Sequence, residues 1–426
     1  MPGTGIQQDV QEQEEGSDDG GIVLGILSYN NIETIGNVIH AAQAGLSMHF
    51  PGSQCLLVNV DGGSKDGTQA LAQESVLDKE GFLQIPYSIN PAQKLSPEYF
   101  GVPGKTNAIK AVCGVANERN AKVCAVVDSN VRSVTQEWVE ALVRPVVGGG
   151  FDFVSPCYLR HKFDGVIFSG IVYPFTRALY GKRIQQPMGG EVAFSAKLVK
   201  YFLQQPQWDG DVPDPGSDIW ITTQAVRGGF RVAQTFLGSR ILGNGEPAPE
   251  VSSILAQTLG SIFTEMDRTA SVWQRVRGSE KVPSFGPCGE IDAEPAPVDI
   301  NPMIQSFRLG HQSLQDIWRM VLSPATLMEL KRMSLQTADT FRFDDSHWAR
   351  VIYDFALAWR MRIMDRDHLL KALTPLYLGW VASHISAVRD ADSNQTQASI
   401  ERLCLAFEAQ KGYFISRWRW PDRFNP

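Results

Sequence analysis

Short apolar runs alternate with helix-length stretches in the first half of the chain. Four of these runs predict buried β-strands, at Ile22–Leu27, Cys55–Val60, Val123–Val127 and Phe153–Pro156. Strands that alternate with helices are typical of a mostly parallel sheet whose strands are joined by crossover helices. The pattern therefore predicts an α/β domain over residues 21–250.

The apolar spacing becomes helical in the second half of the chain. Apolar residues recur three and four positions apart from Ile254 to Phe263 and again from Trp348 to Trp359. A proline-rich loop, Gly278–Pro302, lies between these two segments. The sequence therefore predicts a helical C-terminal domain over residues 251–426. Residues 1–20 are rich in Gln, Glu, Asp and Gly and predict a disordered tail.

Composition narrows the classes of function. The 426 residues carry a formal net charge of −7, which argues against general nucleic-acid binding. No apolar run approaches the roughly 20 residues that span a bilayer, and no Cys-x-x-Cys pair indicates a zinc site or a disulfide framework. We therefore expect a cytoplasmic protein with no membrane partner. Apolar helix faces in the C-terminal half could pair protomers in a homo-oligomer.

Polar loops follow the ends of the predicted strands, which is where ligands bind in open α/β sheets. The first loop is Ser28–Glu33, whose Asn side chains could equally cap a helix. The second is Asp61–Thr68, where glycines let the backbone approach a ligand and Asp61 can accept hydrogen bonds from a base or a ribose. Asp and Gly also form ordinary turns, so both interpretations stay open for this loop.

Two further loops carry charged side chains. Val102–Asn107 leads into an amphipathic helix, and Lys105 at its start is well placed for a phosphate because unpaired N–H groups and the helix dipole add to its charge. A solvated lysine at a helix start is the plain alternative. The fourth loop is Asp128-Ser129-Asn130, directly after an apolar strand. An acid there could merely cap the next helix, but its place in this series of loops favours a functional role.

Taken in order, the four loops resemble the nucleotide-sugar half of a GT-A glycosyltransferase. Two more segments resemble the mannosylglycerate synthase family and, more distantly, glucosyl-3-phosphoglycerate synthase: Gln186–Glu191, which reads Gln-Pro-Met-Gly-Gly-Glu, and Ser217–Thr223. The resemblance spans roughly residues 21–385. It implies an α/β GT-A nucleotide-diphospho-sugar transferase fold with a mostly parallel central sheet, plus a helical C-terminal domain.

The resemblance also implies an activity. A retaining hexosyltransferase of compatible-solute synthesis would move a hexose from GDP-mannose, or from UDP- or GDP-glucose, to a small hydroxy acid such as D-glycerate. Catalytic roles fall on Glu191, which would bind sugar hydroxyls, and on Asp218, near the reacting centre. The implied donor-binding residues are Ser28, Tyr29, Asn31, Asp61, Lys105, Asp128, Ser129, Gly189 and Gly190.

Arg160 and Asp164 match an Arg-x-x-x-Asp pair that the family uses in its acceptor pocket. A guanidinium suits this place because its fork of donors pairs with a carboxylate. The alternative for the two residues is an ordinary i, i+4 helix ion pair. Phe168 stands where the family has a hydroxyl-bearing Thr, so a larger or less polar acceptor than D-glycerate is also open.

The chain departs from the family at the expected site for Mg²⁺ or Mn²⁺. Asp128 and Asn130 are its candidate ligands, and the second is an amide in place of the usual acid. The family's metal-binding histidine is missing, because no histidine occurs between His161 and His311. A cation could still bind through Asp128, Asn130, diphosphate and water. Equally, Arg240 could supply the positive charge and make the enzyme independent of metal.

Two other functions stay open. One is an inverting family-2-type glycosyltransferase in which Asp218 acts as the catalytic base. The other is a degenerate, non-catalytic sugar-nucleotide-binding protein, which the altered metal ligands would explain.

Overall fold

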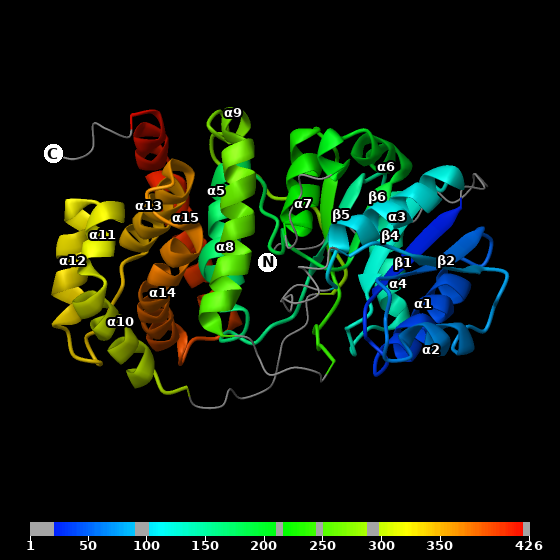
Figure 1. Cartoon of the computed structure of the whole chain (residues 1–426), viewed down its shortest axis with the longest axis horizontal. Helices are drawn as coiled ribbons and strands as arrows, with labels where there is room; N and C mark the ends of the chain where they lie inside the picture. The colour runs from blue at the N-terminus through cyan, green and yellow to red at the C-terminus, as the bar shows by residue number, and fades with distance from the viewer. Residues whose placement is uncertain (1–20, 90–101, 210–215, 244–249, 288–297, 421–426) are drawn as a thin grey trace, which may run out of the picture.

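The computed structural model describes residues 21–89, 102–209, 216–243, 250–287 and 298–420. The predicted tail, residues 1–20, lies outside the described residues. Figure 1 shows two regions, a sheet flanked by helices and a separate group of helices that contains residues 298–420.

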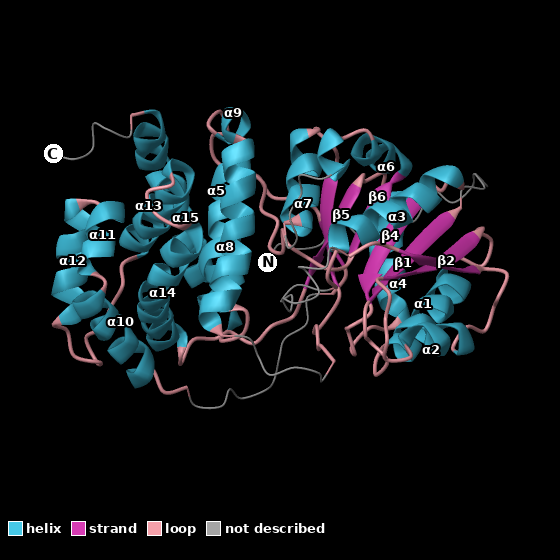
Figure 2. Cartoon of the chain, viewed as in Figure 1, coloured by secondary structure: helices cyan, strands magenta, loops and turns pink. Residues whose placement is uncertain are grey.

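The sheet has eight strands in the order β3-β2-β1-β4-β6-β5-β7-β8, and Figure 2 shows it lying between helices. Neighbouring strands pair in parallel except at β6, which runs antiparallel to both β4 and β5. The strands are β1 (Ile22–Ser28), β2 (Cys55–Asp61), β3 (Phe82–Pro86), β4 (Val123–Asp128), β5 (Phe153–Cys157), β6 (Val192–Ser195), β7 (Val232–Phe236) and β8 (Ser284–Phe285).

All four predicted strands are confirmed, and each runs one residue beyond its predicted end. The added residue is polar in β1, β2 and β4, where it is Ser28, Asp61 and Asp128. The predicted α/β class, with a mostly parallel central sheet and a helical C-terminal region, is also confirmed.

Helices cover both faces of the sheet, so β1 is buried along its whole length, including the polar Ser28 at its end. One face packs against α1 (Ile35–His49) and α4 (Gln136–Val147). The other packs against α3 (Lys105–Glu118), α6 (Ala196–Leu203) and α7 (Ser217–Arg227).

Gly25 in β1 lets α3 lie unusually close to the sheet. A Cβ at this position would lie 2.5 Å from Cγ2 of Val112, inside van der Waals contact. The missing side chain therefore sets how closely α3 packs against the sheet. It also sets where the first residue of that helix lies relative to the strand ends.

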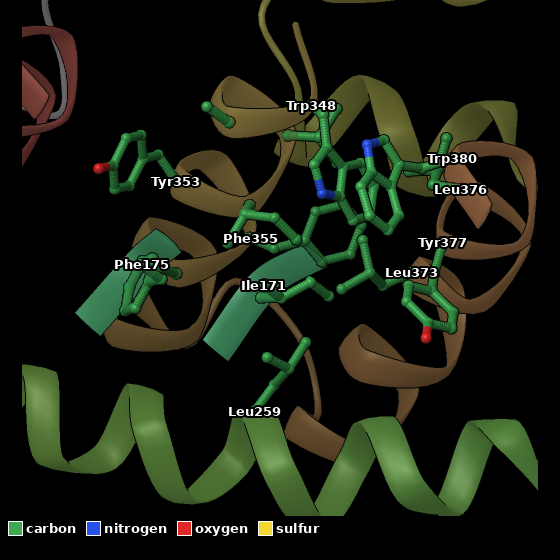
Figure 3. Packing of buried hydrophobic residues seen from close by; sticks show 14 of the residues in the cluster. Ile171, Phe175, Leu259, Trp348, Tyr353, Phe355, Leu373, Leu376, Tyr377 and Trp380 are labelled. Carbon is green, nitrogen blue, oxygen red and sulfur yellow. The ribbon is translucent and has the colours of Figure 1, made fainter. Parts of the chain in front are cut away.

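The C-terminal region is helical, as predicted. Figure 3 shows its core, where the rings of Trp348 and Trp380 stack with centroids 5.3 Å apart near Ile171 and Leu373. The helices are α8 (Val251–Arg268), α9 (Ala270–Trp273), α10 (Asn301–Ser313), α11 (Gln315–Val321), α12 (Pro324–Ser334), α13 (Asp345–Met361), α14 (Arg366–Val388) and α15 (Ser393–Arg419). Among the described helices, none is both long and apolar enough to cross a membrane.

Each region also contains a segment from the other part of the chain. A short π-helix, η2 (Phe168–Val172), and α5 (Tyr173–Tyr180) belong to the first half of the chain but pack in the helical core. There the indole Nε1 of Trp348 donates to the Gly170 carbonyl at 2.9 Å. In return, β8 pairs with β7 and extends the sheet. The segment from β5 to α5 thus runs from the sheet into the helical region, and the predicted boundary near residue 250 stays a prediction.

Candidate active site

Five charged side chains gather at the carboxyl edge of the sheet, and all five residues come from different elements. Lys105 is the first residue of α3, and Asp128 ends β4. The other three are Glu191 before β6, Asp218 in the first turn of α7 and Arg240 after β7. Apart from the guanidinium of Arg240, whose side chain is 15% exposed, the charged groups are almost fully buried.

The antiparallel strand β6 brings Glu191 to this edge. In the β4–β6 ladder Val126 lies opposite Val192, so the chain enters β6 beside the end of β4. Asp128 and Glu191 therefore lie at the same edge, although one follows its strand and the other precedes it. A parallel β6 would have placed Glu191 at the far edge of the sheet.

Lys105 is held between two carboxylates. Its Nζ lies 3.0 Å from Oδ1 of Asp218 and 3.3 Å from Oδ2 of Asp128. Gly104 precedes the helix with φ +72°, a left-handed conformation that a side chain would strain, and so allows the sharp turn into α3. Lys105 was predicted at a helix N-terminus facing a phosphate, and the structure confirms the helix start and adds the two carboxylate partners.

Arg240 links the other two carboxylates. Its Nη2 lies 3.1 Å from Oδ2 of Asp128, and its Nε lies 3.2 Å from Oε2 of Glu191. The Tyr158 hydroxyl also donates to Glu191, and the Arg240 guanidinium lies 5.8 Å from the centroid of the Tyr158 ring. The result is a continuous chain of contacts from Asp218 through Lys105, Asp128 and Arg240 to Glu191.

Burial and charge pull the pKa values of these groups in opposite directions. Burial raises the pKa of Asp218 to about 6, although Lys105 acts to lower it. Burial also raises the pKa of Asp128, against the attraction of Lys105. Burial opposes ionisation of Glu191 as well, but Arg240 outweighs it and the pKa of Glu191 falls below its usual value. Asp218 therefore changes its charge at about pH 6.

The glycine pair predicted to approach a sugar packs tightly. A Cβ on Gly190 would lie 2.5 Å from Oδ2 of Asp128 and 2.9 Å from Nη2 of Arg240. A Cβ on Gly189 would lie 2.2 Å from Cγ of Pro156. Gly190 is thus required by the protein's own ion cluster, and Gly189 by Pro156, besides any requirement that a ligand adds.

The loops Ser28–Glu33 and Asp61–Thr68 are joined by hydrogen bonds into one unit. The carboxylate of Asp61 accepts from the hydroxyls of Ser28 and Ser64 and from the amide of Gln69, at 2.9, 2.6 and 2.6 Å. The backbone N–H groups of Gly63 and Ser64 each donate to the same carboxylate at 2.8 Å. Its lone pairs are therefore all engaged, since a carboxylate has about four such sites. A base N–H could reach Asp61 only by displacing one of these donors.

Asn31 connects this unit to the loop Asp128–Asn130. Its side-chain oxygen accepts from the backbone N–H of Tyr29 at 2.9 Å and from the Ser129 hydroxyl at 2.5 Å. The structure thus brings together three predicted donor residues, Tyr29, Asn31 and Ser129. Their base, ribose and diphosphate contacts stay predictions.

A cavity of about 400 Å³ opens beside the ion cluster. Arg160 and Asp164 line it together with Phe168, and it reaches Asp128, Asp218 and Arg240. The Arg160 guanidinium lies 4.8 Å from the Phe168 ring centroid and 5.6 Å from that of Tyr158. A Cβ on Gly165 would lie 2.1 Å from Nη1 of Arg160, so the missing side chain of Gly165 leaves space for the guanidinium. Arg160 is thus fixed between two rings at the cavity wall.

The helix ion pair considered for Arg160 and Asp164 is wrong. These residues lie in a turn-rich segment between β5 and η2, in which the N–H of Asp164 donates to the His161 carbonyl at 2.8 Å. The i, i+4 spacing therefore does not place the two side chains on one helix face.

The candidate metal ligands show a limited fit to a divalent cation. Oδ1 of Asp128 and Oδ1 of Asn130 are both buried without a hydrogen-bond partner, so they could act as two oxygen ligands. Magnesium prefers six ligands, and four would have to come from diphosphate and water. In the described part of the chain, no three His, Cys, Asp or Glu residues are grouped for metal binding. Arg240 already lies against the other oxygen of Asp128.

Two side chains of the site were not predicted. Tyr158 directly follows β5, and Gln69 lies in α2 (Thr68–Glu74) next to the Asp61 loop. Arg160 and Asp164, in the loop after β5, were predicted only from the family resemblance, because the strand-end rule was not applied to this strand. Applying the strand-end rule to all four predicted strands would have identified Tyr158.

No known protein family and no curated protein matches the chain. Solved structures of glucosyl-3-phosphoglycerate synthase from Mycobacterium tuberculosis are similar to part of it. The complex with Mn²⁺, UDP and glucosyl-3-phosphoglycerate is 23% identical over 59% of this chain and 80% of that chain, with a TM-score of 0.44. The complex with Mn²⁺, UDP-glucose and phosphoglyceric acid is 22% identical over 59% of this chain and 80% of that chain, with a TM-score of 0.43.

A further solved structure, of a mycobacterial protein, is 23% identical over 59% of this chain and 75% of that chain, with a TM-score of 0.44. At this level of similarity, no property of these proteins transfers to the present chain.

The raised pKa of Asp218 predicts a pH-dependent cost to stability. Because the pKa is raised from 3.8 to about 6 in the folded state, the stabilising effect of the neutral carboxyl is present below pH 4 and is lost as the pH rises through 6. Asp218→Asn keeps a neutral group at all pH values. We therefore expect the wild-type free energy of unfolding to fall relative to that of the variant by on the order of 3 kcal/mol between pH 4 and pH 7.

Urea denaturation of both proteins across this range measures the difference. A difference that stays constant with pH would show that Asp218 is already ionised at pH 4 in the folded protein.

Proposed function

We propose that the protein is a glycosyltransferase that moves a hexose from a nucleoside-diphosphate sugar to a small hydroxy-acid acceptor. One observation carries this proposal: a buried cluster of three carboxylates and two cations lies at the carboxyl edge of an open α/β sheet, beside a cavity walled by an oriented arginine. Ligands of such sheets bind at this edge. The cations suit a diphosphate, and the carboxylates suit the hydroxyls of a sugar.

The diphosphate would meet Arg240 and Lys105. Arg240 is the more exposed of the two, at 15% against 2%, and it lines the cavity. It would therefore contact the leaving diphosphate directly, where a preorganised cation stabilises the charge that develops as the glycosidic bond breaks. Lys105 would act from behind the carboxylates of Asp128 and Asp218.

We propose that transfer needs no divalent cation. Arg240 lies 3.1 Å from the carboxylate that the family resemblance assigns to a metal, and it brings one positive charge to that position. If Mg²⁺ or Mn²⁺ binds, Asp128 and Asn130 would hold it, and it would neutralise charge on the diphosphate. The two orphaned oxygens of these residues can instead accept hydrogen bonds from donor hydroxyls.

The acceptor would bind through an acidic group at Arg160. The rings of Tyr158 and Phe168 hold its guanidinium, and Gln186 accepts from Nη2 at 3.4 Å. A guanidinium fixed in this way loses little conformational entropy when it pairs with a carboxylate or phosphate. D-glycerate fits this chemistry, and the apolar Phe168 beside the pocket also suits a larger hydroxy acid.

Asp218 would position the acceptor hydroxyl that attacks the anomeric carbon. In the retaining reaction, the bond from this carbon to the diphosphate breaks on the face that the hydroxyl approaches. The hydroxyl proton then passes to the departing diphosphate, and Asp218 orients the hydroxyl and stabilises the developing positive charge.

An inverting reaction is the second candidate. It is favoured by the pKa of Asp218, about 6, which suits a general base near neutral pH. In that case the hydroxyl attacks the opposite face and its proton goes to Asp218. The anomeric configuration of the product, read by proton NMR, decides between the two reactions.

A donor screen tests the proposal, with one disruptive glycine variant and one neutral variant. We expect at least one of GDP, UDP and their hexose conjugates to raise the melting temperature of the protein, both with and without Mg²⁺. Gly190→Ala should weaken its binding by at least about tenfold, because the new Cβ meets Asp128 and Arg240. Gly114→Ala is the matched control, since its Cβ meets no atom within 4 Å.

Equal binding by wild type and Gly190→Ala would show that the donor does not bind at this edge of the sheet. Failure of every nucleotide to bind would contradict the proposed function itself.

Turnover of Asp218→Asn separates an enzyme from a non-catalytic binder. We expect this variant to keep donor affinity and to lose transfer by about a hundredfold or more, because its amide cannot take a proton or stabilise positive charge. Initial rates with a panel of hydroxy acids measure the loss. Tight nucleotide binding by wild type, with no transfer or hydrolysis across the panel, would favour the non-catalytic binder.

A further inference from the structure

Glu191 lies behind the wall of the cavity beside the ion cluster. Its side chain is 0% exposed. Arg240 and Tyr158 line that cavity, whereas Glu191 is not among the described residues that form its walls. A ligand in the cavity therefore contacts Arg240 and Tyr158, and it does not contact the Glu191 carboxylate unless these side chains move.

The protein's own donors occupy the Glu191 carboxylate. Its Oε1 accepts from Nε and Nη2 of Arg240 at 3.3 and 3.2 Å. Its Oε2 accepts from Arg240 Nε at 3.2 Å and from the Tyr158 hydroxyl. A carboxylate offers about four acceptor sites, so these hydrogen bonds leave none for a sugar hydroxyl.

Arg240 presents one edge of its guanidinium to the carboxylates. Within the described part of the chain, its hydrogen bonds to Glu191 and Asp128 all come from Nε and Nη2, and none comes from Nη1. The two N–H groups of Nη1 thus remain for a ligand. Because the guanidinium is a planar fork, a carboxylate that fixes one edge also fixes the direction of these N–H groups.

Tyr158 contacts the same two side chains. Its hydroxyl donates to Glu191, and its ring centroid lies 5.8 Å from the Arg240 guanidinium. On another side the ring packs against Trp138, with centroids 6.4 Å apart. Glu191 thus binds one guanidinium and one phenol, and both of these groups belong to residues of the cavity wall.

We propose that Glu191 is a positioning residue, which orients Arg240 and Tyr158 toward the donor and does not itself bind the hexose. This role differs from the binding of sugar hydroxyls that the family resemblance implies. Asp128 and Asp218 line the cavity and are left to bind the sugar. The role rests on the proposed function, because it assumes that Arg240 contacts the diphosphate of the donor.

Binding of a nucleoside diphosphate with and without its hexose distinguishes the two roles. The probes are UDP with UDP-glucose and GDP with GDP-mannose, titrated calorimetrically into the whole protein. Glu191→Gln keeps the shape of the side chain and removes its charge. We expect it to weaken a nucleoside diphosphate and its hexose conjugate by the same factor, about tenfold. Loss of affinity for the hexose conjugate alone would overturn the proposal, because it would show direct contact with the sugar.

A double-mutant cycle separates positioning from a general loosening of the site. We expect Arg240→Gln alone to weaken the nucleoside diphosphate by at least about tenfold, because it removes charged hydrogen-bond donors. Glu191→Gln should then add less than about twofold in the Arg240→Gln background. Additive losses would overturn the proposal, since Glu191 would then act independently of Arg240.

Tyr158→Phe provides a milder variant that leaves every charge of the cluster in place. It keeps the ring and removes one hydrogen bond to Glu191. We expect it to weaken a nucleoside diphosphate and its hexose conjugate equally, by about threefold. A loss confined to the hexose conjugate would again contradict the positioning role.

Glu329→Gln is the matched control. Glu329 also accepts from Nε and Nη2 of an arginine, Arg332, but neither residue lines the cavity beside the ion cluster. Its nucleotide affinity should equal that of wild type, and an equal loss there would overturn the specific role of Glu191. If wild type binds none of the four probes, the proposed function fails as well. Unequal or additive losses in a protein that binds them contradict the role of Glu191 alone.

Discussion

The structure depends on one buried ionic arrangement, in which Lys105 and Arg240 stand between three carboxylates. Burying an unpaired charge is costly, so removal of any member leaves its partners without compensation. The pairs Lys105–Asp218 and Arg240–Asp128, at 3.0 and 3.1 Å, therefore tie α7 to α3 and the segment after β7 to β4. The same arrangement leaves charged groups at the edge of a cavity, where a ligand can reach them.

Several features of the fold serve this arrangement. The antiparallel β6 brings Glu191 to the edge where the parallel strands end, Gly25 sets the depth of α3, and Gly190 leaves room between Asp128 and Arg240. The loop after β5 then passes from the ion cluster into the helical core, where the Trp348 indole donates to the Gly170 carbonyl. The helical region thus fixes one wall of the candidate acceptor pocket.

Much of the sheet could be predicted because its buried strands are continuous apolar runs that end in a polar residue, as at Ser28 and Asp128. The other four strands, β3, β6, β7 and β8, were not predicted, and β6 and β8 are too short to carry a periodic pattern. Arg240 was expected to supply the charge of the missing cation, and its guanidinium does lie 3.1 Å from Asp128, although that role stays a prediction. The cavity beside the ion cluster is assembled from distant segments of the chain, so no local sequence pattern could predict it.

The central claim is that Arg240 takes the place of a catalytic cation, and the metal dependence of transfer tests it most directly. The initial rate would be measured after removal of divalent ions by a chelator and again after addition of Mg²⁺ or Mn²⁺, for wild type, Arg240→Lys and Arg240→Gln. The account predicts a wild-type rate that the chelator does not change, a loss of about a hundredfold in Arg240→Gln, and partial activity in Arg240→Lys. A wild-type rate that vanishes in chelator and returns with Mg²⁺ or Mn²⁺ would contradict it.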